Sequence, residues 1–138
     1  MSCISAQREP HSLRILIVED ERDVLDMLEE VLSSEGHTVS TALDGNAGLD
    51  CFQRHTFDIV LTDLNMPGIS GLEMAGRMKK ISPSVPVILL TGWDVGLDTA
   101  ELAAKGINCF IKKPFTIADI LQALDDLCGA GQTLVEAP

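Results

Sequence analysis

The sequence predicts an α/β protein in which helices cover both faces of a parallel sheet. Five short runs of branched apolar residues have the length of buried strands, and a stretch with helical periodicity follows each of them. Neighbouring parallel strands need a crossover connection, which an intervening helix supplies. The alternation therefore indicates a doubly wound, five-stranded parallel sheet with five helices.

Two strands and two helices are expected in the first part of the chain. Residues 13–18 are apolar and branched, and apolar residues then recur at helical spacing over residues 24–32. Residues 37–42 alternate polar with apolar side chains, which is typical of a half-exposed strand near the edge of a sheet. Asp44 follows closely and is a preferred residue type for a helix N-cap, so it predicts the start of the second helix.

The central strand is expected at residues 57–63, where an apolar run stops at Asp63. Pro67 and Gly68 predict a turn just beyond it. Residues 70–73 (SGLE) have the pattern of a capping box and predict the start of the third helix. Asp63 is therefore expected where a buried strand opens into a loop, and ligands of open α/β sheets bind at such carboxyl ends.

The last two strand–helix units follow the same pattern. Residues 85–90 and 107–111 form the fourth and fifth expected strands. The helix between them, within residues 93–106, is expected to be weak because glycines flank and interrupt it. Thr116 is placed to cap the last helix, whose apolar residues form a continuous stripe.

Length and composition are those of one compact domain. The chain has 138 residues, of which 46% are hydrophobic, and its formal net charge is -11. We expect residues 1–12 to be a flexible lead-in, residues 13–128 to form the domain and residues 129–138 to be a short tail. The acidic balance argues against binding to nucleic acids or to anionic membranes, because phosphate-rich surfaces require basic patches.

The sequence lacks the features of a secreted or membrane protein. No apolar run reaches membrane-spanning length, and residues 1–10 lack the apolar core of a signal peptide. The four cysteines, Cys3, Cys51, Cys109 and Cys128, show neither close pairing nor metal-type spacing. We therefore expect free thiols and a cytoplasmic protein.

Polar side chains gather where the expected strands end. Parallel strands bring their carboxyl ends to one edge of the sheet, and the side chains left there are Glu19, Asp20, Glu21, Asp63, Thr91 and Lys113. Clustered carboxylates repel one another unless a cation lies between them, and Mg²⁺ prefers such oxygen ligands. A lysine and a hydroxyl beside the metal offer what a phosphoryl group needs, and an aspartate there can form an aspartyl phosphate.

Four short runs in this pattern resemble the receiver domain of two-component response regulators, the CheY-like family. They are residues 18–21 (VEDE), 62–68 (TDLNMPG), 90–92 (LTG) and 113–115 (KPF), in family order and at family spacing. Each run alone is weak, whereas all four at successive strand ends are highly specific. The resemblance covers roughly residues 13–128 and implies the flavodoxin-like strand order 2-1-3-4-5.

The resemblance implies a role for each residue at the strand ends. Asp63 corresponds to the phosphoacceptor. Asp20 corresponds to the principal Mg²⁺-binding acid, with Glu19 beside it. Asn65 is similar to the residue that offers its backbone carbonyl to the metal, and Lys113 matches the lysine that contacts the phosphate.

The resemblance also implies which residues take part in the conformational switch. Thr91 is similar to the hydroxyl that moves toward the phosphoryl group, and Phe110 matches the aromatic switch position. The peptide bond between Lys113 and Pro114 is expected to be cis, as is usual in the family. Lys112 does not align with the phosphate-contacting lysine and is expected to be exposed.

These roles imply a switch controlled by phosphorylation. A histidine kinase or a histidine phosphotransfer protein would donate the phosphoryl group to Asp63, with Mg²⁺ as cofactor. The surface formed by the fourth helix, fifth strand and fifth helix would then change and bind an output target. The implied protein catalyses only its own phosphorylation and dephosphorylation, and it is a monomer or a phosphorylation-dependent dimer.

Two other functions use similar residues. A phosphohydrolase of the haloacid-dehalogenase type also places an aspartate, a threonine, a lysine and Mg²⁺ at strand ends. It needs a second acid two residues after the nucleophile, where this chain has Asn65, and a cap domain for which there is no room. A docking module that is never phosphorylated would not need the complete set of acids, threonine and lysine.

Several of these residues also have a purely structural interpretation. Asp63 could cap the following turn, Thr91 could be an ordinary strand-end hydroxyl, and Phe110 could belong to the core. For Glu21 the structural interpretation is preferred, because an acid suits the solvated first turn of a helix. Trp93 follows Thr91 by two residues, and we expect its bulk to shield the phosphoryl group from water. The alternative is that Trp93 covers the fourth helix or marks a docking surface.

Overall fold

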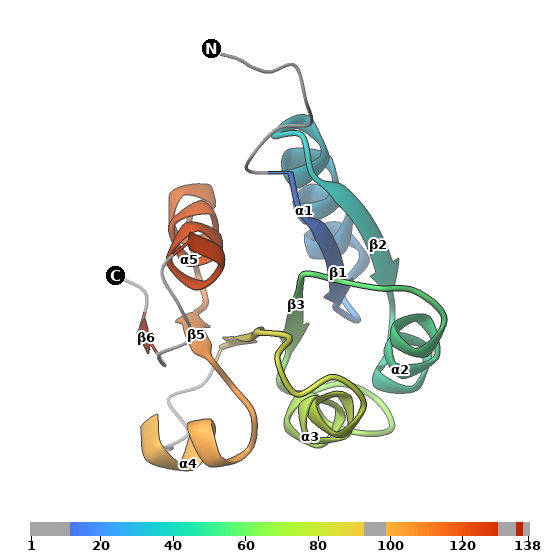
Figure 1. The fold of residues 1–138 in the computed structure, drawn as a ribbon. Helices are drawn as coiled ribbons and strands as arrows, with labels where there is room; N and C mark the ends of the chain where they lie inside the picture. Colours follow the sequence, from blue (N-terminus) through green and yellow to red (C-terminus); the bar gives the residue numbers. More distant parts are fainter. Residues whose placement is uncertain (1–11, 93–98, 130–134, 137–138) are drawn as a thin grey trace.

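The computed structural model describes residues 12–92, 99–129 and 135–136, and it contains one parallel sheet (Figure 1). Its strands are β1 (Arg14–Val18), β2 (Thr38–Ala42), β3 (Ile59–Asp63), β4 (Val87–Thr91), β5 (Cys109–Lys112) and β6 (Val135–Glu136). They lie in the order β2-β1-β3-β4-β5-β6, and every neighbouring pair is parallel. The expected order 2-1-3-4-5 is confirmed, and β6 extends it beyond β5.

In the part of the chain that the structure describes, five helices connect the strands. They are α1 (Arg22–Ser34), α2 (Gly45–Arg54), α3 (Gly71–Ile81), α4 (Thr99–Ala104) and α5 (Ile117–Gly129). α1 and α5 lie on one face of the sheet, and α2, α3 and α4 lie on the other (Figure 1). Each face has its own hydrophobic core, because side chains alternate along a strand. None of the described helices is both long and apolar enough to cross a membrane.

β6 is a two-residue strand within the segment that the sequence analysis treats as a tail. Its backbone pairs in parallel with β5, with Val135 beside Cys109 and Glu136 beside Phe110. Two residues show no periodicity, so the sequence carries no signal for this strand. The pairing places the end of the described chain along β5, the strand that carries Phe110.

The burial of the strands explains why the central runs are continuously apolar. Every residue of β3 and β4 is buried, because helices cover both faces of these strands. β2 lies at one edge of the sheet and is only partly buried, as its alternating sequence predicts. The described cysteines are free, as expected, and Cys109 is buried in the core beneath α1 and α5.

Side chains cap three helices at the positions that the sequence predicts. The Asp44 carboxylate accepts a 2.8 Å hydrogen bond from the Ala47 amide in the first turn of α2. The Ser70 hydroxyl accepts one of 3.1 Å from the Glu73 amide in the first turn of α3. The Thr116 hydroxyl accepts one from an amide in the first turn of α5. These side chains supply hydrogen-bond partners that the first turn of a helix lacks.

We expect Asp44→Ala to lower the free energy of unfolding by about 1 kcal/mol, because the Ala47 amide would lose its partner. Chemical denaturation measures this loss. Asp50→Ala is the matched control on the same helix, since Asp50 contributes an exposed ion pair with Arg54 at 3.2 Å. Its effect should stay within about 0.5 kcal/mol. Equal losses in the two variants would contradict a capping role for Asp44.

Candidate functional site

The carboxyl ends of four neighbouring strands place polar residues at one edge of the sheet. Because β1 and β3 are parallel and in register, Glu19 follows β1 next to Asp63, the last residue of β3. In β4, Thr91 lies one position beyond the register partner of Asp63. Thr91 is itself paired with Lys112 of β5, which directly precedes Lys113. The topology therefore brings segments that are distant in the sequence to one place.

Three carboxylates from two strand ends form a compact acidic cluster. Carboxylate oxygens of Glu19, Asp20 and Asp63 all lie within 4.8 Å of one another. Glu19 is fully buried and Asp63 is 8% exposed, whereas Asp20 is exposed and opens the cluster to solvent. The structure thus brings together the three acidic side chains that the resemblance assigns to the metal and the phosphoryl group.

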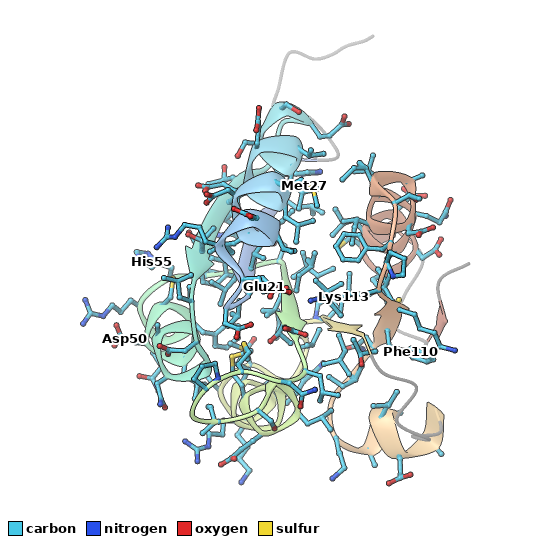
Figure 2. All side chains as sticks on the ribbon, turned by 180° about the vertical axis from the view of Figure 1, so that it is seen from behind. Glu21, Met27, Asp50, His55, Phe110 and Lys113 are labelled. Carbon is cyan, nitrogen blue, oxygen red and sulfur yellow. The ribbon has the colours of Figure 1, made fainter. Side chains whose placement is uncertain are left out.

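Lys113 lies against this cluster from the loop after β5. Its Nζ is 3.2 Å from Glu19 Oε1 and 3.5 Å from Asp63 Oδ2. It is also 3.7 Å from Glu21 Oε1. Figure 2 shows Lys113 and Glu21 near each other at the strand ends, with Phe110 of β5 farther out. One ammonium group therefore faces three carboxylates.

Burial and charge shift the pKa values of the groups in contact. Burial raises the pKa of Glu19 to about 7, and the Asp63 carboxylate acts in the same direction. Burial also raises the pKa of Asp63 above its ordinary value, although Lys113 opposes this shift. Burial alone would lower the pKa of Lys113, but the carboxylates of Glu19, Asp63 and Glu21 raise it above its ordinary value. The positive charge of Lys113 thus neutralises the negative charge of the acidic cluster only in part.

The donor set fits a hard divalent cation. Mg²⁺ prefers oxygen ligands and is typically bound through one or two carboxylates while it keeps several waters. A cation between Glu19, Asp20 and Asp63 would favour their charged forms and so offset the cost of burying Glu19 and Asp63. Asn65, whose backbone carbonyl is the fourth predicted ligand, is an exposed residue of the loop that follows Asp63.

The backbone around Asp63 holds its carboxylate in one orientation. Asp63 Oδ1 accepts a 2.8 Å hydrogen bond from the Leu64 amide, while Oδ2 faces Lys113. The Thr62 hydroxyl donates to the Asp63 carbonyl oxygen at 2.9 Å. Gly71, the first residue of α3, packs so closely on this carbonyl that a Cβ there would overlap it. One carboxylate oxygen is thus held by the main chain, and the other is presented to the charged groups of the site.

The remaining predicted residues lie around this centre. Thr91 is buried at the end of β4, and its carbonyl oxygen accepts a 2.7 Å hydrogen bond from the Lys113 amide. Phe110 is half-buried and packs against the core on the α2, α3 and α4 face. The Lys113–Pro114 peptide bond is cis, as the resemblance implies, and Lys112 is exposed, as expected.

Two contacts of the site go beyond the sequence analysis. The side chain of Glu21 is exposed, as expected for a solvated helical turn, but it also lies within ion-pair distance of Lys113. The close packing of Gly71 on Asp63 is the second, and its one signal in the sequence is a glycine at the start of a helix. Trp93 lies outside the described residues, so its shielding role stays a prediction.

Comparisons with known proteins agree with this fold. The model of the response regulator receiver domain family matches residues 15–125 of the chain. The transcriptional regulatory protein YkoG of Bacillus subtilis, which is uncharacterised, is 39% identical over 107 residues, or 78% of this chain and 47% of that protein. The chain spans about half the length, or less, of the curated relatives that it matches.

Solved structures of similar proteins share the fold. A receiver domain protein of Clostridium thermocellum superposes with a TM-score of 0.78 at 31% identity, and the match covers 83% of this chain and 93% of that chain. The response regulator TrrA of Thermotoga maritima, solved in complex with Mg²⁺–BeF, gives a TM-score of 0.74 at 33% identity over 83% of this chain and 97% of that chain. The chain therefore belongs to the receiver domain family of two-component response regulators.

Proposed function

We propose that this receiver domain is a phosphoacceptor and that Asp63 takes up the phosphoryl group. The observation that carries the proposal is the position of Asp63, whose Oδ2 lies 3.5 Å from Lys113 Nζ within the acidic cluster. The proposed donor is a histidine kinase or a histidine phosphotransfer protein. Membership of the two-component family supports this class of partner.

In the proposed reaction a carboxylate oxygen of Asp63 attacks phosphorus. A new O–P bond forms, the N–P bond to the donor histidine breaks, and the electron pair of that bond returns to the imidazole. Lys113 offers positive charge to the phosphoryl oxygens. Glu19, Asp20, Asp63 and the Asn65 carbonyl would hold Mg²⁺, which supplies further neutralisation of charge during the transfer. The related TrrA was solved in complex with Mg²⁺–BeF, which supports the proposal that a receiver domain of this family takes up Mg²⁺.

We further propose that phosphorylation changes the surface formed by α4, β5 and α5. The added negative charge lies near Thr91 and Lys113 and would draw both toward the phosphoryl group. This would shift the population between two arrangements of α4 and β5, with Phe110 as the switch residue. An output target would bind this surface, and the chain would be a monomer or a phosphorylation-dependent dimer.

A phosphohydrolase is less well supported. Its second acid would have to stand two residues after Asp63, where the chain has Asn65, an amide that cannot transfer the proton. The curated relatives carry the names of transcriptional regulatory proteins and response regulators, which favours a regulatory function. The proposed chemistry is therefore limited to the phosphorylation and dephosphorylation of the domain itself.

The proposed organisation has residues 13–128 as the receiver unit of a cytoplasmic protein, with residues 1–12 as a lead-in and residues 129–138 as a tail. Transcriptional regulators among the longer relatives support an output function beyond the receiver unit. The net charge of -11 argues against direct contact of this chain with nucleic acids or anionic membranes.

Intact mass spectrometry after incubation with Mg²⁺ and a small acyl phosphate tests the proposal. We expect one added phosphoryl group, which is absent in Asp63→Asn and when Mg²⁺ is chelated. Asp50→Asn is the matched control, because Asp50 is an exposed carboxylate on α2, away from the site (Figure 2). This variant should gain the phosphoryl group like the original chain.

Three outcomes would contradict the proposal. Phosphorylation of Asp63→Asn would place the acceptor elsewhere. No adduct from either the acyl phosphate or a panel of phosphorylated histidine phosphotransfer domains, with Mg²⁺ binding confirmed, would favour a docking module. Steady release of phosphate from many phosphate esters would favour a hydrolase.

A further inference from the structure

A second charged feature lies at the opposite end of the strands from the acidic cluster. It is a cavity of about 520 Å³ between the C-terminal ends of α3 and α4 and the loop that leads into β5. α3 and α4 are neighbours on the same face of the sheet (Figure 1). The cavity shares no residue with the acidic cluster or with Lys113.

The lining of this cavity is basic in an acidic chain. The chain has five lysines and a net charge of -11, yet Lys79, Lys80 and Lys105 all line this one cavity. No acidic residue is among the described residues that line it. Within the described ranges, none of the three lysines has an ion pair with a carboxylate. The cavity is therefore a local positive site without compensation from its own walls.

Lys79 is the most constrained of the three lysines. Its Nζ donates a 2.9 Å hydrogen bond to Asn108 Oδ1, which also accepts the Val87 amide at 2.9 Å. Its stem packs over Gly106, where a Cβ would lie 2.8 Å from Lys79 Cγ. Burial lowers the pKa of Lys79, and no described carboxylate opposes the shift. This half-buried cation would be stabilised by an anion in the cavity.

The helix ends explain these lysines only in part. Lys79 and Lys80 lie in the last turn of α3, where the helix dipole favours cations. At the end of α4, however, three carbonyl oxygens already accept main-chain hydrogen bonds from the amides of the turn around Gly106, which has φ +94°. Capping of α4 therefore does not account for Lys105, whose charge adds to the others at the cavity.

We propose that this cavity binds a small organic phosphate, the size of a nucleotide. The ammonium groups of Lys79, Lys80 and Lys105 would contact the phosphate oxygens. The exposed side chains of Pro83, Ala103 and Ala104 supply an apolar wall for the organic part of the ligand. The volume lies in the range of about 300–1,000 Å³ found for small-molecule sites and exceeds what inorganic phosphate alone would fill. The proposal does not depend on the phosphoacceptor function of Asp63.

Titration of the ¹⁵N-labelled chain with ADP in metal-free buffer at constant ionic strength tests this proposal. We expect saturable shifts of the amide signals of Gly76, Gly106 and Asn108, which line the cavity. Lys80→Gln and Lys105→Gln should each raise the dissociation constant about threefold to tenfold. Arg54→Gln is the control, since it removes one exposed positive charge from α2 and should leave the dissociation constant unchanged.

Four results would overturn the proposal. Shifts that do not saturate with ADP would show that no site exists. The same would follow if the lysine variants keep the spectrum of a folded chain and bind ADP with the dissociation constant of the original chain. Shifts of the Leu64 and Lys113 amide signals, in place of those that line the cavity, would show that ADP binds at Lys113 beside the acidic cluster. If inorganic phosphate binds as tightly as ADP, the organic part of the ligand contributes nothing and the proposed class of ligand is wrong. Tighter binding of an oligoglutamate peptide at the same amides would make the cavity a docking site for an acidic protein segment.

Discussion

Gly71→Ala is expected to lower the free energy of unfolding by about 3 kcal/mol or more, which corresponds to a fall in Tm on the order of 10 °C. A Cβ at this position would overlap the carbonyl oxygen of Asp63 and lie 3.2 Å from Leu64 Cα. The Gly71 amide also donates a 2.8 Å hydrogen bond to the Leu64 carbonyl oxygen, so α3 cannot move away without losing it. Chemical and thermal denaturation measure the loss.

Gly76→Ala in the same helix is the matched control for this substitution. A Cβ at Gly76 meets no atom within 4 Å, and alanine is the better helix former by about 1 kcal/mol. The control should therefore be stabilised while Gly71→Ala is destabilised. A Gly71→Ala variant that is as stable as the original chain, and that is phosphorylated at the same rate, would show that Gly71 does not position Asp63.

In metal-free protein, the free energy of unfolding should fall as the pH rises from about 4.5 to about 7, owing to Glu19. Burial raises the pKa of Glu19 from 4.5 to about 7, so the native state holds a proton that the unfolded chain has lost in this window. The stabilisation from protonated Glu19 is fully present below about pH 4.5 and is lost as the pH passes 7. The free energy of unfolding should fall by up to about 3 kcal/mol over this range. The raised pKa of Asp63 acts in the same direction.

Denaturation of the original chain and of Glu19→Gln at several pH values, with a chelator present, isolates this contribution. The difference in the free energy of unfolding between the two chains should change with pH over this window, because glutamine does not titrate. Glu30→Gln, an exposed position on α1, should keep the profile of the original chain. Parallel profiles for the original chain and Glu19→Gln would contradict a proton on Glu19 in the native state.

Saturating Mg²⁺ should reverse this trend in the original chain. Cation binding favours the charged carboxylates and releases the protons, so the gain in stability from Mg²⁺ should grow as the pH rises. At a concentration about 100 times the dissociation constant, the gain is about 2.7 kcal/mol. An effect of Mg²⁺ that does not depend on pH would argue against a metal bound by Glu19 and Asp63.

Local signals predicted the elements of the fold well. Asp44 and Ser70 were identified as helix caps because each of them bonds to an amide only three residues away. The central strand ending at Asp63 was evident because both of its faces are buried, which requires a continuous apolar run. β6 had no such signal, since its two residues owe their conformation to pairing with β5 and not to their own sequence.

The composition of the candidate site was predictable, but its geometry was not. Strand ends identified Glu19, Asp63 and Lys113, and the resemblance assigned their roles. Glu19 and Lys113 are 94 positions apart in the chain, and their 3.2 Å contact depends on the order of the strands. The ion pair of Glu21 and the packing of Gly71 also depend on how loops from different strands meet.

By itself, the sequence determined the class of fold, the element boundaries near capped helices and the residue types at the strand ends. These depend on interactions within a few residues and on the period of apolar side chains. The tertiary structure decided which oxygen of Asp63 faces Lys113, how deeply Glu19 is buried, and that three lysines from α3 and the loop before β5 share a cavity. Such features arise only when distant segments pack, because charge, burial and close contact act through space and not along the chain.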